Sequence, residues 1–375
     1  MSTLFILFLR ICVFLFDFLF AFLNIMTTTY HKKPVKNDVA IDDSRRSGMR
    51  VLIMGAAGMV GQKLLNRLQN VDTGLGNITK MYLHDMVPAN TASWAGESEV
   101  LVGNIADSAE MQKLADLKPD VIFQLASIVS GEAELEFTKG WQVNMAGSWA
   151  FLEALRQHHE DSGGSYVPKI IFTSSIAVFG PPFPDKISDE FLCAPQTSYG
   201  AQKAIVEMLI SDYSRKGYID GISIRLPTIC VRPGKPNLAA SSFFSGIIRE
   251  PLNGVEAILP VSDEVRHWHA SPRSAARFLT HAASLNLSAL GSRRALNMPG
   301  VSCTVAEQIE ALRQVAGNDV VGLIKPQLED RIVKIVAGWP RNFDTRRAHA
   351  LGFESEASFE EIIKIYMDDD LPGKS

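Results

Sequence analysis

The chain has few cysteines, no long run of positive charge and no cluster of metal ligands. Four cysteines occur in 375 residues and none forms a Cys-x-x-Cys pair, so we expect reduced thiols and not a disulfide scaffold. The formal net charge is −4, which does not suggest a nucleic-acid-binding surface. No spacing of His, Cys and carboxylates is typical of zinc, and no repeat of solenoid length occurs, so we expect no metal and no repeat architecture. What remains is a chain long enough for a cofactor domain and a smaller partner region.

A glycine-rich turn follows the first apolar segment of the folded part. The run Met49–Met54 has the composition of a buried parallel strand. Gly55 then allows a tight turn, Gly58 lets a phosphate approach the backbone, and Gly61 permits close packing of helix on strand. The N-terminus of the following helix would face a dinucleotide pyrophosphate. The alternative is an ordinary strand–turn–helix connection.

An acidic residue ends the next expected strand. This strand covers residues 80–84, and Asp85 follows it, 24 residues after Gly61. A carboxylate at this place binds ribose hydroxyls and repels the extra phosphate of NADP. The sequence therefore predicts NAD as the cofactor.

A serine pair, a tyrosine and a lysine could form a proton-transfer site. Ser174 and Ser175 end an expected strand, and Tyr199 and Lys203 lie four residues apart, on the same face of an expected helix. An ammonium near a phenol lowers the pKa of the phenol from about 10. Tyr199 could then move a proton near neutral pH while a nicotinamide takes or gives hydride. The alternative is a chance pair on a helix surface.

These motifs together resemble the extended short-chain dehydrogenase/reductase superfamily, which includes NAD-dependent sugar epimerases and dehydratases. The resemblance covers about Met49 to Met367 and includes the serine signature that ends in Phe179-Gly180, where Phe replaces the commoner Tyr. It implies a Rossmann-type, doubly wound parallel α/β sheet with a smaller C-terminal substrate-binding region, and Ser175, Tyr199 and Lys203 as catalytic residues. The cofactor contacts implied by the turn and the resemblance are Gly55, Gly58, Met59, Val60, Gly61, Asp85, Asn104, Ile105, Leu125, Ala126, Tyr199, Lys203 and Pro227.

Shorter segments resemble the branch of this superfamily that oxidises small sugar acids. They include residues 124–134, 231–237 and 266–269. The resemblance implies NAD-dependent oxidation of a secondary hydroxyl of a small, D-erythronate-like polyhydroxy acid, with Tyr199 as the proton acceptor. A nucleotide-sugar epimerase that retains NAD and a non-catalytic NAD-binding protein are the alternatives. The expected substrate contacts are Ser127, Ser175, Thr228, Arg232 and Arg266.

Two of these substrate contacts remain open from the residues alone. The guanidinium of Arg232 has the shape to hold a carboxylate, but an ordinary surface ion pair would explain an arginine there equally well. Either Arg266 or its neighbour His267 could reach the substrate, or both could pack the lid. Asn144, in contrast, is expected to be structural and to bond the nearby backbone.

The first 48 residues do not fit this fold. Residues 1–25 form a hydrophobic leader, in which the run 4–25 is long enough to span a bilayer despite two charges, and residues 26–48 form a polar linker. Basic residues after the run would keep the enzyme in the cytoplasm if the leader is an anchor. The alternative is that translation starts at Met26 or Met49.

The remainder divides into an NAD-binding domain over residues 49–232 and a mainly substrate-binding region over residues 233–375. Two long helices are expected over residues 141–158 and 198–216, and two copies of the chain could pair through them as a homodimer. A late helix is marked by a capping box from Thr304 to Glu307.

Overall fold

The computed structural model describes residues 48–234 and 240–371. The predicted hydrophobic leader and most of the predicted linker lie outside these residues. Within the described part of the chain, no helix is both long and apolar enough to cross a membrane. The folded part begins with the strand β1 at Met49, the residue at which the sequence places the start of the cofactor fold.

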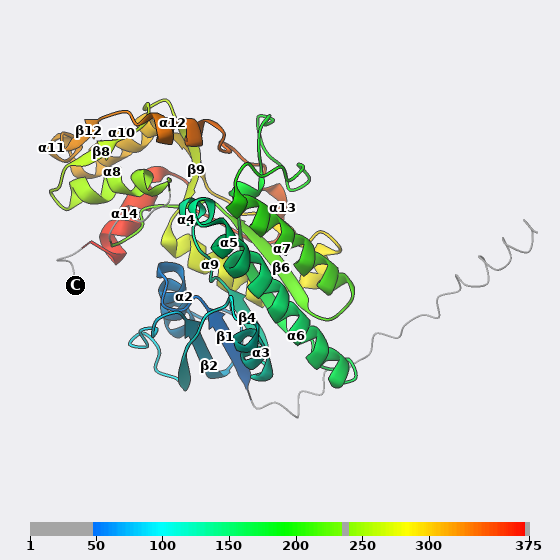
Figure 1. The fold of residues 1–375 in the computed structure, drawn as a ribbon. Coiled ribbons are helices and arrows are strands. Elements are labelled where there is room, and N and C mark those ends of the chain that lie inside the picture. Colours follow the sequence, from blue (N-terminus) through cyan, green and yellow to red (C-terminus); the bar gives the residue numbers. More distant parts are fainter. Residues whose placement is uncertain (1–47, 235–239, 372–375) are drawn as a thin grey trace, which may run out of the picture. The chain divides into compact units, whose positions relative to one another are not determined.

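A seven-stranded parallel sheet forms the centre of the cofactor fold (Figure 1), in the order β10-β6-β5-β4-β1-β2-β3. All neighbouring strands run parallel. The strands are β1 (Met49–Met54), β2 (Ile78–Asp85), β3 (Ser98–Val102), β4 (Val121–Gln124), β5 (Lys169–Ser175), β6 (Asp220–Leu226) and β10 (Ala295–Asn297). The order reverses direction between β1 and β4, and ligands bind beyond the carboxyl ends of the strands at such a point.

Helices cover both faces of this sheet, and the alternation of side chains along β1 shows why. Val51 and Ile53 point to one face and pack with α2 and α9, whereas Leu52 and Met54 point to the other and pack with α3, α6 and α7. These helices are α2 (Met59–Asn70), α3 (Ser108–Asp116), α6 (Gly147–Asp161), α7 (Ser198–Arg215) and α9 (Pro272–Ser284). The predicted doubly wound α/β fold is confirmed.

The expected helix over residues 141–158 is built in two parts. Trp141–Ala146 forms a π-helix, η1, and α6 follows it directly. At the junction, a Cβ on Gly147 would lie 2.0 Å from the carbonyl oxygen of Ile105, so only glycine lets the helix come this close to the loop after β3. The buried Asn144 holds both the amide (2.9 Å) and the carbonyl (3.2 Å) of Ile128 with its side chain, and donates to Gln202. This agrees with the structural role expected for Asn144.

The later part of the chain forms two small sheets and their helices. One sheet has the order β11-β9-β7 and the other pairs β12 with β8. The core of this later part is an apolar cluster separate from those of the large sheet, and it includes Phe244, Ile247, Leu312 and Ile362. The strands are β7 (Thr228–Ile229), β8 (Ala257–Leu259), β9 (Arg266–Ala270), β11 (Val301–Thr304) and β12 (Ile324–Pro326). The helices are α8 (Ser242–Leu252), α10 (Val305–Ala316), α11 (Asn318–Val321), α12 (Asp330–Ala337), α13 (Arg346–Ala350) and α14 (Phe359–Asp369).

Short elements complete the chain, and one late helix starts as the sequence predicts. Thr304 accepts from the amide of Glu307 while the Glu307 carboxylate accepts from the amide of Thr304, which confirms the capping box of α10. The short elements are α4 (Ser130–Leu135), α5 (Phe137–Gly140), η2 (Ile176–Val178) and η3 (Leu287–Leu290). The chain after residue 233 also returns to the large sheet through β10 and α9, so the division at residue 232 remains a functional prediction.

Candidate active site

The glycine turn lies between β1 and α2 and has no room for side chains. Gly55 has φ +93°, and a Cβ there would lie 2.8 Å from the amide nitrogen of Ala126. A Cβ on Gly61 would lie 2.3 Å from the carbonyl oxygen of Gly55, so α2 packs against the turn through bare backbone. Gly58 precedes α2 and leaves its first amides uncovered by a side-chain cap. This cradle fits a dinucleotide pyrophosphate.

Asp85 joins the end of β2 to the glycine turn. Its Oδ2 accepts a hydrogen bond from the amide of Ala57 at 2.9 Å, and its Oδ1 accepts from the amide of Met86 at 2.7 Å. Each carboxylate oxygen keeps a second lone pair for a ribose hydroxyl. Asp85 therefore supports the turn and places a negative charge beside it.

The charge on Asp85 predicts the choice between the two nicotinamide dinucleotides. Replacing Asp85 with Ser should narrow the preference for NAD over NADP by about tenfold or more, because a repulsion on the order of 1–4 kcal/mol between close charges is removed. Asp85→Asn is the matched control for shape, since its side chain keeps an acceptor for the amide of Ala57 but has no charge. It should narrow the preference as Asp85→Ser does if the charge is the cause. The measurement is kcat/KM with each cofactor. Equal use of both cofactors by the unaltered enzyme would contradict the assignment.

Other predicted cofactor residues lie at the carboxyl edge of the sheet or beside it. The amides of Leu125 and Ala126 both donate to the carbonyl of Met54, which fixes the chain after β4 against the end of β1. Asn104 is exposed and its Oδ1 accepts from the amide of Ala106, whereas Ile105 is buried in the sheet core.

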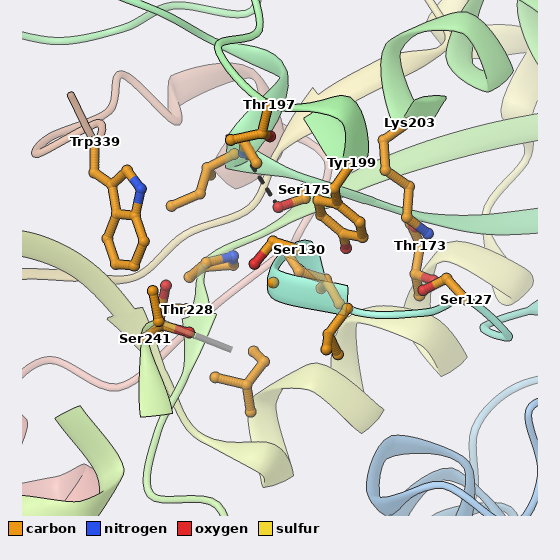
Figure 2. A pocket seen from close by; sticks show the side chains of 18 of the residues that line it. Ser127, Ser130, Thr173, Ser175, Thr197, Tyr199, Lys203, Thr228, Ser241 and Trp339 are labelled. Atoms are coloured by element: carbon orange, nitrogen blue, oxygen red, sulfur yellow. Dashed lines mark hydrogen bonds between the residues drawn. The ribbon is translucent and has the colours of Figure 1, made fainter. Parts of the chain in front are cut away.

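A cavity of about 390 Å³ opens at the same edge and brings most of the predicted site together (Figure 2). Figure 2 shows Tyr199 and Lys203 on one side, and Thr228, Ser241 and Trp339 on the other. The predicted residues that line the cavity are Met59, Val60, Leu125, Ser127, Ser175, Tyr199, Lys203, Pro227, Thr228 and Arg232. Those that lie outside its lining are Gly55, Gly58, Gly61, Asp85, Asn104, Ile105, Ala126 and Arg266.

Tyr199 and Lys203 lie in the first turns of α7, which Thr197 caps by accepting from the amide of Gly200. Lys203 is 2% exposed, its Nζ donates to the carbonyl of Thr173 at 2.8 Å, and the Nζ lies 5.6 Å from the centre of the Tyr199 ring. The one-turn spacing thus brings the ammonium and the phenol together, as the sequence predicts. Ser175, at the end of β5, faces the same cavity.

The electrostatics of this pair differ from the sequence-based expectation. Burial raises the pKa of Tyr199 to about 12, against hydrogen bonds with Ser175 and Ser127 that lower it. Burial also lowers the pKa of Lys203 to about 7, against the attraction of Glu207. The prediction that Lys203 brings the pKa of Tyr199 below its ordinary value is therefore not met in the protein alone, because burial acts on both groups and favours their neutral forms.

The two adjacent serines have different roles. Ser174 is buried and donates to Glu207 at 2.5 Å, and Glu207 also pairs with Arg225 at 2.8 Å. Ser175 instead accepts from the amide of Ala177 at 3.1 Å. The ion pair was not anticipated from the sequence, although Glu207 continues the four-residue spacing of Tyr199 and Lys203. The contacts of Ser174 support Ser175 as the serine that meets substrate.

The lid differs most from the sequence-based expectations. Arg266 is not brought to the cavity: it donates to the carbonyl of Ser302 at 3.0 Å and pairs with Glu307 at 3.2 Å, because successive residues of β9 face opposite ways. Its neighbour His267 lines the cavity instead. The lining also contains Ser130, Thr197, Ser241, Arg331 and Trp339, which sequence reasoning missed. Ser130 and Trp339 lie in segments that carry the resemblance and Thr197 lies just before Tyr199, but nothing in the sequence marks these side chains as part of the cavity wall.

Among residues 48–234 and 240–371, no group of three or more His, Cys, Asp and Glu side chains could hold a metal ion. The doubly wound sheet, the glycine turn at its reversal point and the acid that ends β2 define a dinucleotide-binding protein of the Rossmann class. The chain belongs to the NAD dependent epimerase/dehydratase family, whose model matches residues 51–282. The superfamily and the NAD cofactor expected from the sequence are confirmed.

Curated relatives and solved structures cover most of the chain. It is 45% identical over 326 residues to D-erythronate dehydrogenase of Cupriavidus necator (86% of this chain, 98% of the relative), and 39% identical over 328 residues to the D-erythronate dehydrogenase of Haemophilus influenzae (86% and 100%). The nucleoside-diphosphate-sugar epimerase of Agrobacterium tumefaciens has a similar structure, with a TM-score of 0.83, 52% identity, and 87% of this chain and 95% of that chain covered. The L-threonine dehydrogenase of Clostridium difficile, at 22% identity and a TM-score of 0.72, shares the fold, and the match covers 85% of this chain and 96% of that chain.

Proposed function

We propose that this protein is a dehydrogenase that uses NAD to oxidise a secondary hydroxyl of a small, D-erythronate-like polyhydroxy acid to the ketone. The observation that carries the proposal is one cavity that holds Ser175, Tyr199 and Lys203 together with a half-buried cation, Arg232. The first three groups suit proton transfer at a hydroxyl, and Arg232 suits an acid. The names of the two curated relatives support the same substrate class.

The three polar residues divide the proton chemistry between them. Tyr199 as phenolate accepts the proton of the substrate hydroxyl, while Ser175 and Ser127, which hydrogen-bond Tyr199, orient the substrate oxygen. Lys203 stabilises the phenolate from the next turn of α7 and holds the nicotinamide ribose. NAD, when bound, supplies the hydride acceptor.

Arg232 is the proposed partner of the substrate carboxylate. Arg232 lines the cavity and its guanidinium donates to Ser241 at 3.3 Å, and no ion pair of Arg232 with a carboxylate is found among the described residues. Burial lowers the pKa of Arg232, with the nearby charge of Arg249 acting in the same direction. A half-buried cation of this kind is stabilised by an anionic ligand. These contacts favour a carboxylate clamp over a surface ion pair as the role of Arg232.

A nucleotide-sugar epimerase that retains NAD is the second candidate, because the Agrobacterium protein, which is 52% identical, is named a nucleoside-diphosphate-sugar epimerase. The same Ser, Tyr and Lys would serve that reaction. A non-catalytic NAD-binding role is the third, but the three catalytic side chains are all present at the cavity. Net formation of NADH separates the first candidate from both others.

The experiment is a spectrophotometric screen for NADH with four- to six-carbon sugar acids, the matching sugar alcohols and nucleotide sugars. It is run on the full chain and on a chain that starts at Met49. We expect NADH with a sugar acid and much less with the alcohol that lacks the carboxylate. Arg232→Met should remove this difference by slowing oxidation of the acid. Turnover of a nucleotide sugar without NADH release would replace this proposal with the epimerase.

We also propose that two copies pair through α6 and α7, and that the enzyme works in the cytoplasm. The two helices lie side by side (Figure 1), and each carries a large apolar side chain in solvent: Trp149 is 52% and Met208 is 65% exposed. An apolar patch formed by such side chains would be typical of a subunit contact. Sedimentation analysis tests the pairing, and we expect the mass of two chains.

A further inference from the structure

The ring of His267 lies in the wall of the cavity between two oxygen atoms. Its Nδ1 is 2.9 Å from the carbonyl oxygen of Pro340, and its Nε2 is 2.7 Å from the hydroxyl oxygen of Thr228. Thr228 and Pro340 both line the cavity with His267. The imidazole thus connects the lid segment at Pro340 to the residue where β7 begins, across the carboxyl end of the sheet.

The carbonyl of Pro340 fixes where the imidazole carries its proton. A carbonyl oxygen can only accept, so Nδ1 of His267 must be the donor in that bond. In a neutral ring, Nε2 then has no proton and can only accept. The hydroxyl of Thr228 must therefore donate its single proton to Nε2 of His267.

The surroundings of His267 keep the ring neutral. His267 is 3% exposed, stacks on Phe244 with the ring centres 5.2 Å apart and the planes within 3°, and lies 5.1 Å from the ring centre of Trp339. The other titratable ring against it is His269, at 5.3 Å, which is itself buried. Burial lowers the pKa of His267 to about 4. The direction of the bond is therefore fixed at neutral pH.

From this geometry we infer that Thr228 offers only hydrogen-bond acceptance to the cavity, and that it selects a substrate hydroxyl at this point and rejects a keto or carboxylate oxygen. His267 is the positioning residue that imposes this polarity by taking the proton of Thr228. The inference rests on the proposed function, since it describes a non-reacting hydroxyl of the polyhydroxy acid.

This polarity complements that of Arg232 in the same cavity. Arg232 has only donors and therefore binds the carboxylate, whereas Thr228 has only lone pairs to offer and binds a hydroxyl. A substrate that turned end for end would place its carboxylate against an acceptor and a hydroxyl against a cation. The pair therefore determines the direction in which a polyhydroxy acid lies before Tyr199.

The substrate test uses the acid that proves active, D-erythronate first, and analogues in which one non-reacting hydroxyl is replaced by hydrogen or by fluorine. At the one hydroxyl position that contacts Thr228, we expect kcat/KM to fall about 10–100-fold, and equally for hydrogen and for fluorine, because neither substituent can donate a hydrogen bond. Thr228→Val should cause a similar loss on the parent acid and no further loss on that analogue, and Thr228→Ser should restore most of the rate. A fluorine analogue that is clearly better than the hydrogen analogue would show that Thr228 donates, and would overturn the inference.

A second measurement does not depend on activity. Nitrogen NMR of isotope-labelled histidine reports which ring nitrogen is protonated, and comparison with His267→Phe, which keeps the stacking on Phe244, assigns the signal. We expect the proton of His267 on Nδ1 near neutral pH, and a shift of the Nε2 signal in Thr228→Val. A proton on Nε2 overturns the inference even in an active enzyme. If no polyhydroxy acid is oxidised but Nδ1 carries the proton, the proposed function fails and the hydrogen-bond direction stands.

Discussion

Replacing Tyr199 with phenylalanine should lower kcat by roughly 10²–10⁴-fold, the usual value of general acid–base catalysis. The ring keeps its packing in the cavity, so the fold and the affinity for NAD should change little. The lost group is the phenol that hydrogen-bonds Ser175 and Ser127 and would take the substrate proton. Steady-state kinetics and NAD binding by calorimetry measure the two effects separately.

Matched variants show whether the loss belongs to the hydroxyl of Tyr199. Tyr218→Phe removes a phenol beyond the other end of the same helix, outside the cavity lining, and should leave kcat unchanged. Ser175→Ala should cost less than Tyr199→Phe, because it removes an orienting bond and no proton carrier. Near-full activity of Tyr199→Phe on the identified substrate would place the proton acceptor elsewhere in the cavity.

The pKa of Tyr199 also bears on the pH dependence of the reaction. In the oxidation direction the rate should rise with pH as the phenol ionises, because the phenolate is the base. The pKa of about 12 applies to the buried side chain in the protein alone. A kinetic pKa below 10 in the working complex would show that positive charge gathered around Tyr199 during turnover outweighs the burial.

The large sheet was predictable because its signals are local. The apolar run of β1, the bare turn at Gly55 and the acid at the end of β2 each occupy one short continuous segment of the sequence, and each reflects backbone geometry or burial. Tyr199 and Lys203 were predictable for the same reason, since one helical turn fixes their spacing. Parallel strands then bring these segments to one edge without any further information from the sequence.

The lid and the buried charges were not predictable in this way. His267 and Arg266 are adjacent, and only the pairing of β9 with its neighbours decides which of them faces the cavity. The ion pair of Glu207 with Arg225 joins α7 to β6, and neither residue carries a local mark of its partner. The raised pKa of Tyr199 in the protein alone could not be predicted, because burial, which no sequence pattern measures, raises this pKa and lowers that of Lys203.

Replacing Lys203 with methionine should reduce kcat by about 10²-fold or more and weaken NAD binding, while raising the stability of the folded protein at pH 7 and below. The activity falls because the variant loses the ammonium beside Tyr199. The stability rises because burial lowers the pKa of Lys203 from 10.5 to about 7, and each pKa unit corresponds to about 1.4 kcal/mol of cost for the charged form. The lost bond to the carbonyl of Thr173 offsets about 1 kcal/mol of this gain.

The pH dependence of this stability difference is the decisive part of the prediction. Below pH 7, Lys203 is charged in the folded and unfolded chains, and the folded chain bears the whole cost of burying the charge. As the pH rises above about 7, the folded chain loses this proton and the unfolded chain keeps it up to about 10.5, so the wild-type protein gains stability over that window. The advantage of Lys203→Met should therefore be largest at pH 7 and below and should shrink toward pH 10 in urea unfolding experiments. Lys216→Met, at the exposed end of α7, should show no such trend. An advantage that stays constant or grows with pH would mean that Lys203 keeps its charge in the folded protein, stabilised by Glu207, and that the cation beside Tyr199 is permanent.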